Sequence, residues 1–541
     1  MKNILIGGAW PYANGSLHIG HIAALLPGDV LARYYRLKGD QVFYVSGSDC
    51  HGTPVAIRAK QEGRTPKEIS DYYHSEFSYV FGKLGFSYDV YGKTTDQSHI
   101  DFVTSFHKKL YSSEYVYEKT SAQAFCKHCQ KVLADRMVKG LCPNCGSKTR
   151  GDQCDDCGLV LEAETVLYPA CSECGSTISF IETNQLYIAL SKLQSELTAY
   201  LASKPHWRKN AIAFTKRYID EGLRDRAITR NLDWGINVPK EGYDDKRIYI
   251  WAENVLGYLS ASNTVASKRG IKFEELWGDN SRHYYVHGKD NIPFHSIILP
   301  ALLLAHDESL RLPDDIISSE YLTLEGRKIS TSNNWAIWAK DIAEKYNPDS
   351  LRYFFISNGP EKRDTDFSWR EFVEKNNSEL LGAYGNFVNR TLAFIFKYND
   401  GVIPKGTVES NINQIIDEIY HKAGRKIEEG QFKDALDTLF EFVRFGNRYY
   451  DLKEPWKTRT ESPDECANTL YTCVQIISNL AVLLKPFLPF SSERISNWLQ
   501  LEDKWKPQYV EAGLRLPEIS ILFERLDKKI IDEEKNKMSN Q

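Results

Sequence analysis

At 541 residues the chain is too long for a single hydrophobic core, so we expect three or four folded units. A hydrophobic content of 42% and a charged content of 26% are ordinary for a soluble globular protein. The formal net charge of −4 excludes attraction of a polyanion by the whole molecule, so any contact with nucleic acid must come from local basic patches.

The N-terminal run 1–8 lacks the long apolar stretch and the cleavage site of a signal peptide. No run approaches the ~18 apolar residues of a membrane span, and the apolar segment 297–305 is too short. We therefore expect a cytoplasmic protein with no membrane partner. Because that compartment keeps thiols reduced, paired cysteines there argue for metal rather than for disulfides.

The first elements in chain order predict a doubly wound α/β fold. A short buried strand at 4–6 is followed by a turn-rich loop at 11–16 and by a helical pattern over 17–37, in which Pro27 should kink or interrupt the helix. A second strand follows at 42–45. Strand, helix and strand in this order form the βαβ unit of a parallel sheet, which binds ligands at the carboxyl ends of its strands.

The middle of the chain changes character. Residues 116–180 are rich in Cys, Gly and Asp and lack the apolar residues for a core, so we expect an insertion held by metal. Helical patterns resume at 186–201, and strand-like segments at 247–251 and 283–287 fit the second half of the sheet. After 328 the pattern is largely helical, with long amphipathic helices such as 432–450. The polar residues 533–541 are expected to fray.

Eight of the eleven cysteines form four Cys-x2-Cys pairs: Cys126/Cys129, Cys142/Cys145, Cys154/Cys157 and Cys171/Cys174. Two such turns complete one tetrahedral zinc site, so eight ligands predict two structural Zn2+ sites without an open position for chemistry. The spacing favours metal ligands over the alternative of eight free thiols. Sequential and nested pairing of the turns are both feasible.

A pair of histidines stands at the predicted helix start. His18 and His21 are three residues apart and share one face, where free N–H groups attract phosphate. Their imidazoles can hydrogen-bond an α-phosphate during its transfer, and Gly20 leaves room for a flat base. Taken alone, histidines that cap or pack a helix are the default interpretation.

Lys328 begins a second polar segment, which continues with Ser330, Thr331 and Ser332. Its ammonium and the neighbouring hydroxyls suit a pyrophosphate leaving group. A solvated turn is the alternative for such a loop considered by itself.

Together, the His-Ile-Gly-His segment and the lysine–serine loop some 300 residues later resemble the class I aminoacyl-tRNA synthetases. Over nearly its full length the chain resembles the methionyl-tRNA synthetases, with the cysteine turns matching their zinc insertion in its two-knuckle form. This resemblance implies a fold with a Rossmann-type parallel-sheet catalytic domain, a zinc-knuckle insertion and a C-terminal α-helical bundle. It also implies activation of L-methionine with ATP and Mg2+, followed by transfer to tRNA(Met).

The resemblance carries roles to individual positions. Catalysis is implied for His18, His21 and Lys328, and ATP binding for Gly20, Gly288, Asp290, Ser330 and Thr331. Methionine binding is implied for Trp10, Tyr12, Asp49, Trp251, Tyr258 and His295, with Asp49 as the counter-charge of the α-ammonium. Anticodon binding is implied for Asn386, Arg390 and Trp456. An uncharged thioether must be selected by shape and polarizable aromatic walls, which fits this set.

Three departures from the family pattern concern the site. Thr331 stands where the second signature commonly has another lysine, so Lys328 is expected to carry the charge stabilisation alone. Trp10 replaces an aliphatic residue of the methionine pocket, and Asn254-Val255 stands where Ala-Pro is common. These changes affect the shape of the pocket rather than the substrate class.

The resemblance also implies nested zinc pairing, with Cys126/Cys129 paired with Cys171/Cys174. The expected units are 1–115 and 231–320 for the catalytic domain, 116–230 for the insertion, 321–375 for the second-signature and stem-contact region, and 376–541 for the anticodon-binding domain. A C-terminal β-barrel that dimerises some members is not seen, so a monomer is expected.

Two rival functions are weighed against this one. Leucyl, isoleucyl and valyl synthetases need a far larger editing insertion, and a cysteinyl enzyme needs a cysteine before the first signature, where none precedes Cys50. A non-catalytic zinc-containing tRNA-binding paralogue is the rival from another class. The intact His18, His21, Asp49 and Lys328 argue against it.

Overall fold

The fold is seen in a computed structural model that describes residues 2–154, 156–159, 161–331 and 334–539. A five-stranded sheet has the order β14-β13-β1-β2-β3, and all its pairings are parallel. Its strands are β1 (Asn3–Gly8), β2 (Gln41–Ser48), β3 (Val90–Lys93), β13 (Ser281–Gly288) and β14 (Asp315–Ser319). Because the chain leaves β1 in one direction and returns on the other side as β13, the topological switch point lies between these two strands.

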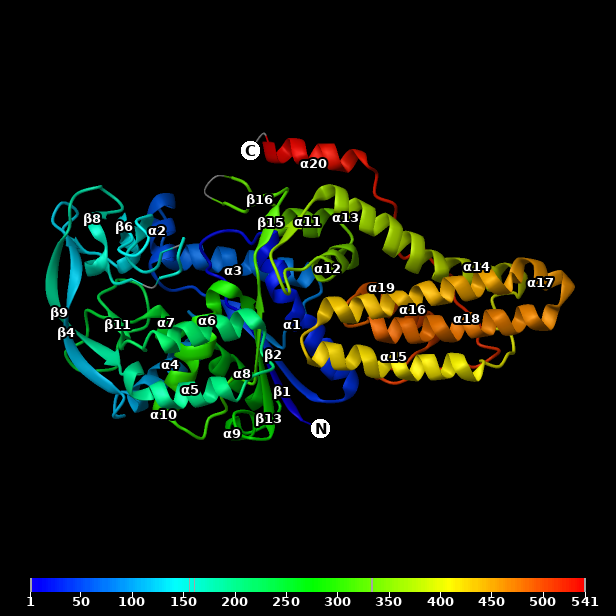
Figure 1. The fold of residues 1–541 in the computed structure, drawn as a ribbon, viewed down its shortest axis with the longest axis horizontal. Helices are drawn as coiled ribbons and strands as arrows, with labels where there is room; N and C mark the ends of the chain where they lie inside the picture. The colour runs from blue at the N-terminus through cyan, green and yellow to red at the C-terminus, as the bar shows by residue number, and fades with distance from the viewer. Residues whose placement is uncertain (1, 155, 160, 332–333, 540–541) are drawn as a thin grey trace.

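Alternate residues of the central strands face two separate cores. Ile4 and Ile6 of β1 join the core beneath α1 (Ile19–Lys38), whereas Leu5 joins the core beneath α8 (Gly257–Lys268). Helices therefore cover both faces of the sheet, as a doubly wound fold requires. The predicted α/β class with a cysteine-rich insertion and a helical C-terminal part is confirmed. Figure 1 shows the sheet in the middle of an elongated molecule, with the insertion at one end and the helices at the other.

Pro27 was expected to kink or interrupt the helix, and the interruption is wrong, because α1 continues through this residue to Lys38. The helix is buried on most sides, with Ala23, Leu26 and Val30 in the core around the proline. Packing between the sheet and α12 (Pro348–Ser357) holds the helix together, despite the N–H group that proline lacks.

The predicted sheet strand at 247–251 is also wrong. β12 (Arg247–Ile248) pairs antiparallel with β11 (Thr229–Arg230) outside the central sheet, and α7 (Ile250–Glu253) begins immediately afterwards. The sheet is completed instead by β13, as expected at 283–287, and by β14, which the sequence pattern did not single out. Short apolar runs are compatible with either a strand or a buried helix, and here the helix forms the wall of a cavity.

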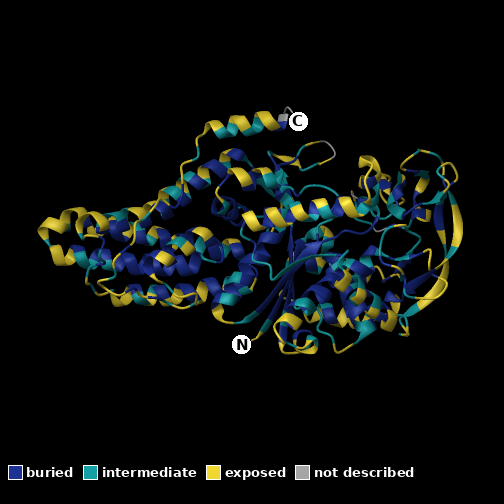
Figure 2. Ribbon diagram, turned by 180° about the vertical axis from the view of Figure 1, so that it is seen from behind, coloured by how far each residue is buried: buried dark blue, intermediate teal, exposed yellow. Residues whose placement is uncertain are grey.

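The insertion is built on an antiparallel ribbon of β4 (Val116–Cys126) and β9 (Ser179–Ile188), which β5 (Lys131–Val132) and β10 (Arg226–Ala227) extend. A second sheet of β6 (Val138–Leu141), β7 (Lys148–Arg150) and β8 (Leu167–Cys171) lies at its tip. The helix expected over 186–201 begins later than predicted, since β9 runs to Ile188 and α5 covers Gln194–Ala202. Figure 2 shows that exposed residues are frequent in this ribbon, whereas the central sheet is buried.

Further helices of the N-terminal and middle parts of the chain are α2 (Thr53–Glu62), α3 (Pro66–Lys83), α4 (Gln97–Leu110), α6 (Lys209–Asp220), α9 (Phe273–Leu276), α10 (Leu299–His306) and α11 (Ala339–Lys345). The C-terminal bundle comprises α13 (Trp369–Lys375), α14 (Asn386–Tyr398), α15 (Ser410–Glu428), α16 (Phe432–Lys453), α17 (Pro455–Glu461), α18 (Pro463–Leu484) and α19 (Pro489–Leu499). The helix expected at 432–450 is thus confirmed.

One helix of the described chain, α18, has the length and composition of a membrane span, contrary to the expectation that no segment approaches one. Its most apolar window is 83% buried inside the bundle, and a buried core helix meets the same criteria. Its apolar character is explained by contacts with α16, α17 and α19.

The C-terminal segment does not fray as predicted over its described part. α20 (Lys529–Ser539) lies beside α13 and α11 (Figure 1), and Glu534 accepts hydrogen bonds from Tyr346 and Lys345. Lys535 forms an ion pair of 2.8 Å with Glu325. These long-range contacts supply the order that the local sequence pattern does not show.

Candidate active site and metal centres

The two signature histidines form a reciprocal cap at the start of α1. The Nδ1 atom of His18 accepts the backbone N–H of Gly20 at 3.1 Å, and the Nδ1 atom of His21 accepts the backbone N–H of His18 at 3.1 Å. Their ring centroids are 4.0 Å apart. Since both Nδ1 atoms accept, each neutral ring carries its proton on Nε2, which leaves two N–H donors for a ligand.

Both histidines are held neutral. Burial, with a smaller contribution from His21, lowers the pKa of His18 to about 2, and burial lowers the pKa of His21 to about 4. A Cβ atom at Gly20 would stand 2.9 Å from Cε1 of His18, so a glycine there also lets the His18 ring pack against the helix start. Gly20 was predicted to make room for a flat base, and in the structure it also makes room for the His18 ring.

Lys328 lies at the mouth of the same region, on the hairpin of β15 (Leu322–Leu324) and β16 (Arg327–Lys328). Glu325 and Gly326 form its turn with positive φ values of 48° and 77°. The Lys328 ammonium is exposed and stands 5.9 Å from the centroid of the Tyr321 ring. An exposed, unshielded ammonium next to a cavity is available to a polyanionic ligand.

The hydroxyl residues of this loop are placed differently from Lys328. Ser330 exchanges backbone hydrogen bonds of 2.9 Å with Trp335, and Thr331 accepts one from Asn334. Neither lines the cavity described next, and Ser332 lies outside the described residues. The structure therefore brings Lys328, and not Ser330 or Thr331, to the site.

A cavity of about 570 Å³ lies at the carboxyl ends of β1 and β13, where the topology predicts a ligand. It unites the predicted nucleotide and amino-acid residues in one space, although they come from distant parts of the chain. Of the predicted residues, those that line it are Trp10, Tyr12, His18, Gly20, His21, Trp251, Tyr258, Gly288, Asp290, His295 and Lys328.

One end of the cavity has aromatic walls. The Tyr258 hydroxyl donates to Nε2 of His295 at 2.8 Å, while Nδ1–H of His295 donates to the Asn291 carbonyl at 2.8 Å. Both side chains are buried, and burial lowers the pKa of His295 to about 4. The neutral His295 ring is thus fixed in one tautomer by its two partners.

Two tryptophans contribute to the same end. Trp251 packs edge-on against Phe294, with ring centroids 5.1 Å apart. Trp10 lies against Gly257, where a Cβ atom would approach its ring to 2.7 Å. The glycine thus admits a tryptophan beside α8, which accounts for a large ring at position 10.

Asp49 is fully buried and does not itself line the cavity. Its Oδ2 atom accepts Nδ2–H of the lining residue Asn254 at 3.1 Å, and its backbone bridges to Tyr12. Burial, followed by the nearby Glu253 carboxylate, raises the pKa of Asp49 well above its usual range. Its Oδ1 atom has no hydrogen-bond partner within the part of the chain that the structure describes.

Several residues of this site were missed by sequence reasoning. Phe294, Tyr321 and Asn254 line the cavity, and Tyr321 donates a hydrogen bond of 2.5 Å to Asp290. From the sequence, Asn254 was named only as a departure from the family pattern, and the neighbouring Glu253 was not named. An acidic residue within an otherwise apolar segment that forms a pocket wall was the available signal.

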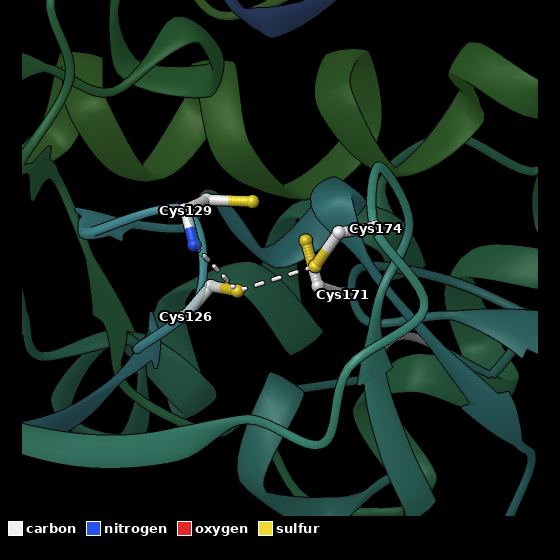
Figure 3. Close-up of side chains that lie close together, drawn as sticks. All are labelled: Cys126, Cys129, Cys171 and Cys174. Carbon is white, nitrogen blue, oxygen red and sulfur yellow. Dashed lines mark hydrogen bonds between the residues drawn. The ribbon is translucent and has the colours of Figure 1, made fainter.

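The cysteines form two groups in the nested arrangement. Cys126, Cys129, Cys171 and Cys174 make one group, with all Sγ atoms within 4.8 Å of one another, and their side chains converge in Figure 3. Cys142, Cys145, Cys154 and Cys157 make the other, within the same limit. Each group offers four thiols to one metal ion, so the pairing implied by the resemblance is confirmed.

The predicted anticodon residues lie on the helical bundle. Arg390 of α14 bonds Asp451 at 2.6 Å and covers the Tyr450 ring at 4.3 Å. Trp456 at the start of α17 is 46% exposed and lies 5.9 Å from the Tyr450 ring. Asn386 is exposed one helical turn before Arg390. Arg390 and Trp456 thus both lie beside the Tyr450 ring, with Asn386 one helical turn from Arg390.

Comparisons with known proteins cover nearly the whole chain. The family model of class I tRNA synthetases (M) matches residues 4–392, and that of the anticodon binding domain of methionyl tRNA ligase matches residues 403–541. The chain is 52% identical over 538 residues to methionine–tRNA ligase 1 of Alkaliphilus oremlandii, covering 99% of both chains. It is also 52% identical over 540 residues to the methionine–tRNA ligase of Bacillus cereus strain AH187, again covering 99% of both.

Among solved structures, the fold matches that of the Mycobacterium tuberculosis methionyl-tRNA synthetase in complex with methionyl-adenylate. The TM-score is 0.81 at 22% sequence identity, and the match covers 97% of this chain and 100% of the other. The two family models and the two relatives that match over 99% of the chain agree, and the chain therefore belongs to the methionine–tRNA ligase family of the class I tRNA synthetases.

Proposed function

We propose that the 570 Å³ cavity binds L-methionine at its aromatic end and ATP at its histidine end. As a methionine–tRNA ligase, the enzyme joins methionine to tRNA with conversion of ATP to AMP and diphosphate. The observation that carries the proposal is that one cavity is lined by both sets of residues, which brings a carboxylate and an α-phosphate together.

At the histidine end, the neutral His18 and His21 rings act as hydrogen-bond donors in the activation of the carboxylate. The substrate carboxylate attacks the α-phosphate in line, and the Nε2–H groups of His18 and His21 donate hydrogen bonds to its oxygens. Lys328 supplies positive charge to the leaving diphosphate, and Gly288 and Asp290 contact the nucleoside side. Mg2+, when bound together with ATP, would neutralise part of the phosphate charge. Ser330 and Thr331 reach the phosphates only if their loop closes toward the cavity.

The aromatic end selects a thioether by shape and polarizability. Trp10, Trp251 and Tyr258 provide ring surfaces for the methionine side chain. Tyr12 and Asp49 lie on the side where the α-amino group would be held, and Asp49 supplies its counter-charge. His295, whose Nε2 is occupied by Tyr258, contributes a fixed neutral wall.

The surface formed by Asn386, Arg390 and Trp456 is proposed to bind the anticodon of tRNA(Met). A half-exposed tryptophan can stack on an unpaired base, and a guanidinium next to it can bond a base edge or a phosphate. The units 1–115, 116–230, 231–320, 321–375 and 376–541 then divide catalysis, metal binding and tRNA recognition.

Both cysteine groups are proposed to hold structural Zn2+. A tetrahedral site with Zn–S bonds of about 2.3 Å places its sulfurs about 3.8 Å apart. Three Sγ–Sγ distances fit this spacing, at 3.5 Å for Cys126–Cys174, 3.8 Å for Cys142–Cys157 and 3.6 Å for Cys145–Cys154. Four thiolates leave no open position, so the metals hold the insertion and take no part in the reaction. We further propose a monomer located in the cytoplasm, without a membrane partner.

Replacement of Lys328 by alanine tests the catalytic assignment. Lys328→Ala should lower the rate of methionine-dependent ATP–diphosphate exchange about a hundredfold or more, because a positioned charge donor is lost from the transition state. Arg327→Ala, which removes the neighbouring exposed cation on the same hairpin, serves as the matched control and should stay within about threefold of the wild type. A fall of less than about threefold in Lys328→Ala would contradict the assignment, since it corresponds to under 1 kcal/mol of transition-state stabilisation.

A further inference from the structure

Four buried titratable side chains lie together behind the aromatic end of the cavity. Asp49 and Glu253 are 0% exposed, and His51 and His99 are 4% and 3% exposed. They come from the loop after β2, the end of α7 and the first turn of α4, so the fold collects them from three distant places. Two carboxylates this close and this deep in a protein need compensation.

The two histidines contact the Glu253 carboxylate rather than that of Asp49. His51 donates a short hydrogen bond from Nδ1 to Oε1 of Glu253, and Nε2 of His99 stands 3.9 Å from the same oxygen. The other ring nitrogen of His99 bonds the Ser260 hydroxyl at 2.8 Å. The Asp49 side chain accepts a hydrogen bond from the neutral amide of Asn254, and its Oδ1 atom remains without a partner among the described residues.

The charges of this cluster can be counted. The Glu253 carboxylate raises the pKa of His51 against the effect of burial, whereas burial lowers the pKa of His99 to about 3. His51 is therefore the cation and His99 is neutral. Burial and Glu253 raise the pKa of Asp49, which disfavours its ionised form, and the positive charge of His51 opposes that rise. When Asp49 ionises opposite a bound ammonium, two carboxylates and one imidazolium leave a net charge of −1, located on Asp49 next to a cavity wall.

We propose that His51 and Glu253 are positioning residues that set the charge of the amino-acid ammonium site: the His51 imidazolium neutralises Glu253, so that the cluster keeps one negative charge on Asp49 to match one α-ammonium. This inference rests on the proposed binding of methionine in the cavity. It assigns a role in substrate binding to two side chains that do not line the cavity themselves.

Removal of the cation from this cluster has a specific consequence. Without His51, two carboxylates would share one buried space, and such pairs bind a proton rather than ionise together. A shared proton cancels the charge that the ammonium requires. For each unit by which the pKa of Asp49 exceeds the assay pH, the ionised fraction of Asp49 falls about tenfold. The affinity for an ammonium falls in the same proportion.

The test is a double-mutant cycle on the full-length enzyme, read by methionine-dependent ATP–diphosphate exchange. His51→Gln should raise the KM for methionine at least tenfold, with the KM for ATP unchanged within about threefold. Glu253→Gln should change the KM for methionine less than about threefold, because an uncharged His51 next to a neutral amide leaves the net charge at −1. The double variant should recover the KM of Glu253→Gln, since its only charge is again Asp49.

A ligand without the ammonium supplies the second readout. Inhibition by 4-(methylthio)butanoate, which has the thioether and carboxylate of methionine but no amino group, should be equal within about threefold in the wild type and in His51→Gln. A merely structural role of the pair predicts additive losses in the double variant and equal weakening of both ligands, and either result overturns the inference.

A variant that does not fold and a wild-type enzyme without activity have different meanings. If His51→Gln does not fold, the double variant alone decides, because the inference requires it to fold and to bind methionine within about threefold of Glu253→Gln. A wild-type enzyme that shows no methionine-dependent exchange contradicts the proposed function itself, whatever the variants do.

Discussion

Two neutral imidazoles, and not two cations, line the end of the cavity that we propose binds the ATP phosphates. This state follows from burial together with the backbone N–H groups that occupy Nδ1 of His18 and His21. The sequence indicated the residue pair and its place at a helix start. It did not indicate the reciprocal cap or the tautomer, because both depend on the local geometry of the loop before α1. A neutral donor keeps its role over a wide pH range, which a charged histidine would not.

The predicted pH behaviour of these rings can be measured directly. In 15N-histidine-labelled protein, the signals of His18 and His21, assigned by His→Asn variants, should show the Nε2–H tautomer and should not titrate between about pH 5.5 and 8, since their pKa values of about 2 and 4 lie below this range. Free imidazole in the same sample serves as the internal pH probe. A midpoint near 6.5 for either ring would contradict the neutral-donor account.

The lowered pKa values of His18 and His21 also make the free energy of unfolding fall as the pH falls. A histidine whose pKa is lower in the folded state binds fewer protons there than in the unfolded chain. Its contribution to the free energy of unfolding is therefore complete above the unfolded pKa of about 6.5 and declines as the pH falls toward the folded value. Acidification between about pH 6.5 and 4 should accordingly destabilise the fold around α1.

At the scale of elements, the cysteine knuckles were the part most fully predictable from sequence. In three of them the second cysteine is followed by a glycine at φ of 72–74°, and in the first by Gln130 at φ 52°, so each tight turn uses a left-handed residue. Sequence spacing left the pairing open, because pairing depends on sheet register. β8 lies against β6, with Cys171 opposite Val138. This strand pairing returns the last knuckle to the neighbourhood of the first.

The element-scale prediction concerns metal content. The purified enzyme should contain about two zinc ions per chain, and Cys145→Ser should reduce this to about one, because the two cysteine groups share no ligand. Cys473→Ser, a buried cysteine of α18 outside both groups, is the matched control and should retain about two. Metal analysis by inductively coupled plasma mass spectrometry decides. Loss of both ions, or of neither, in Cys145→Ser would contradict two independent sites.

At the scale of the whole molecule, a buried arginine joins the catalytic domain to the helical bundle. Arg352 of α12 is 1% exposed, forms an ion pair of 2.7 Å with Asp29 of α1, and donates to the carbonyls of Leu84, Pro486 and Phe487. The pairing of Asp29 with Arg33 and Arg352 outweighs its burial and lowers its pKa. No local pattern predicts such a contact, since its partners are hundreds of residues apart.

The same limit explains the elements that sequence patterns misjudged. Pro27 stays inside α1, and 250–253 is helical rather than strand, because tertiary packing decided in both places. The α/β class and the parallel sheet were predictable from periodicity and loop composition. The union of distant residues in one cavity was implied only by resemblance, and the buried Glu253–His51 pair was not foreseen by either route.

The central claim is that this cavity activates methionine, and ATP–diphosphate exchange with each standard amino acid tests it most directly. The account predicts exchange with methionine alone, because the aromatic walls select a thioether and Asp49 anchors its ammonium. Absence of exchange with every amino acid would contradict the catalytic account, and exchange with a different amino acid would show that the pocket around Trp10 and Asn254 selects another side chain.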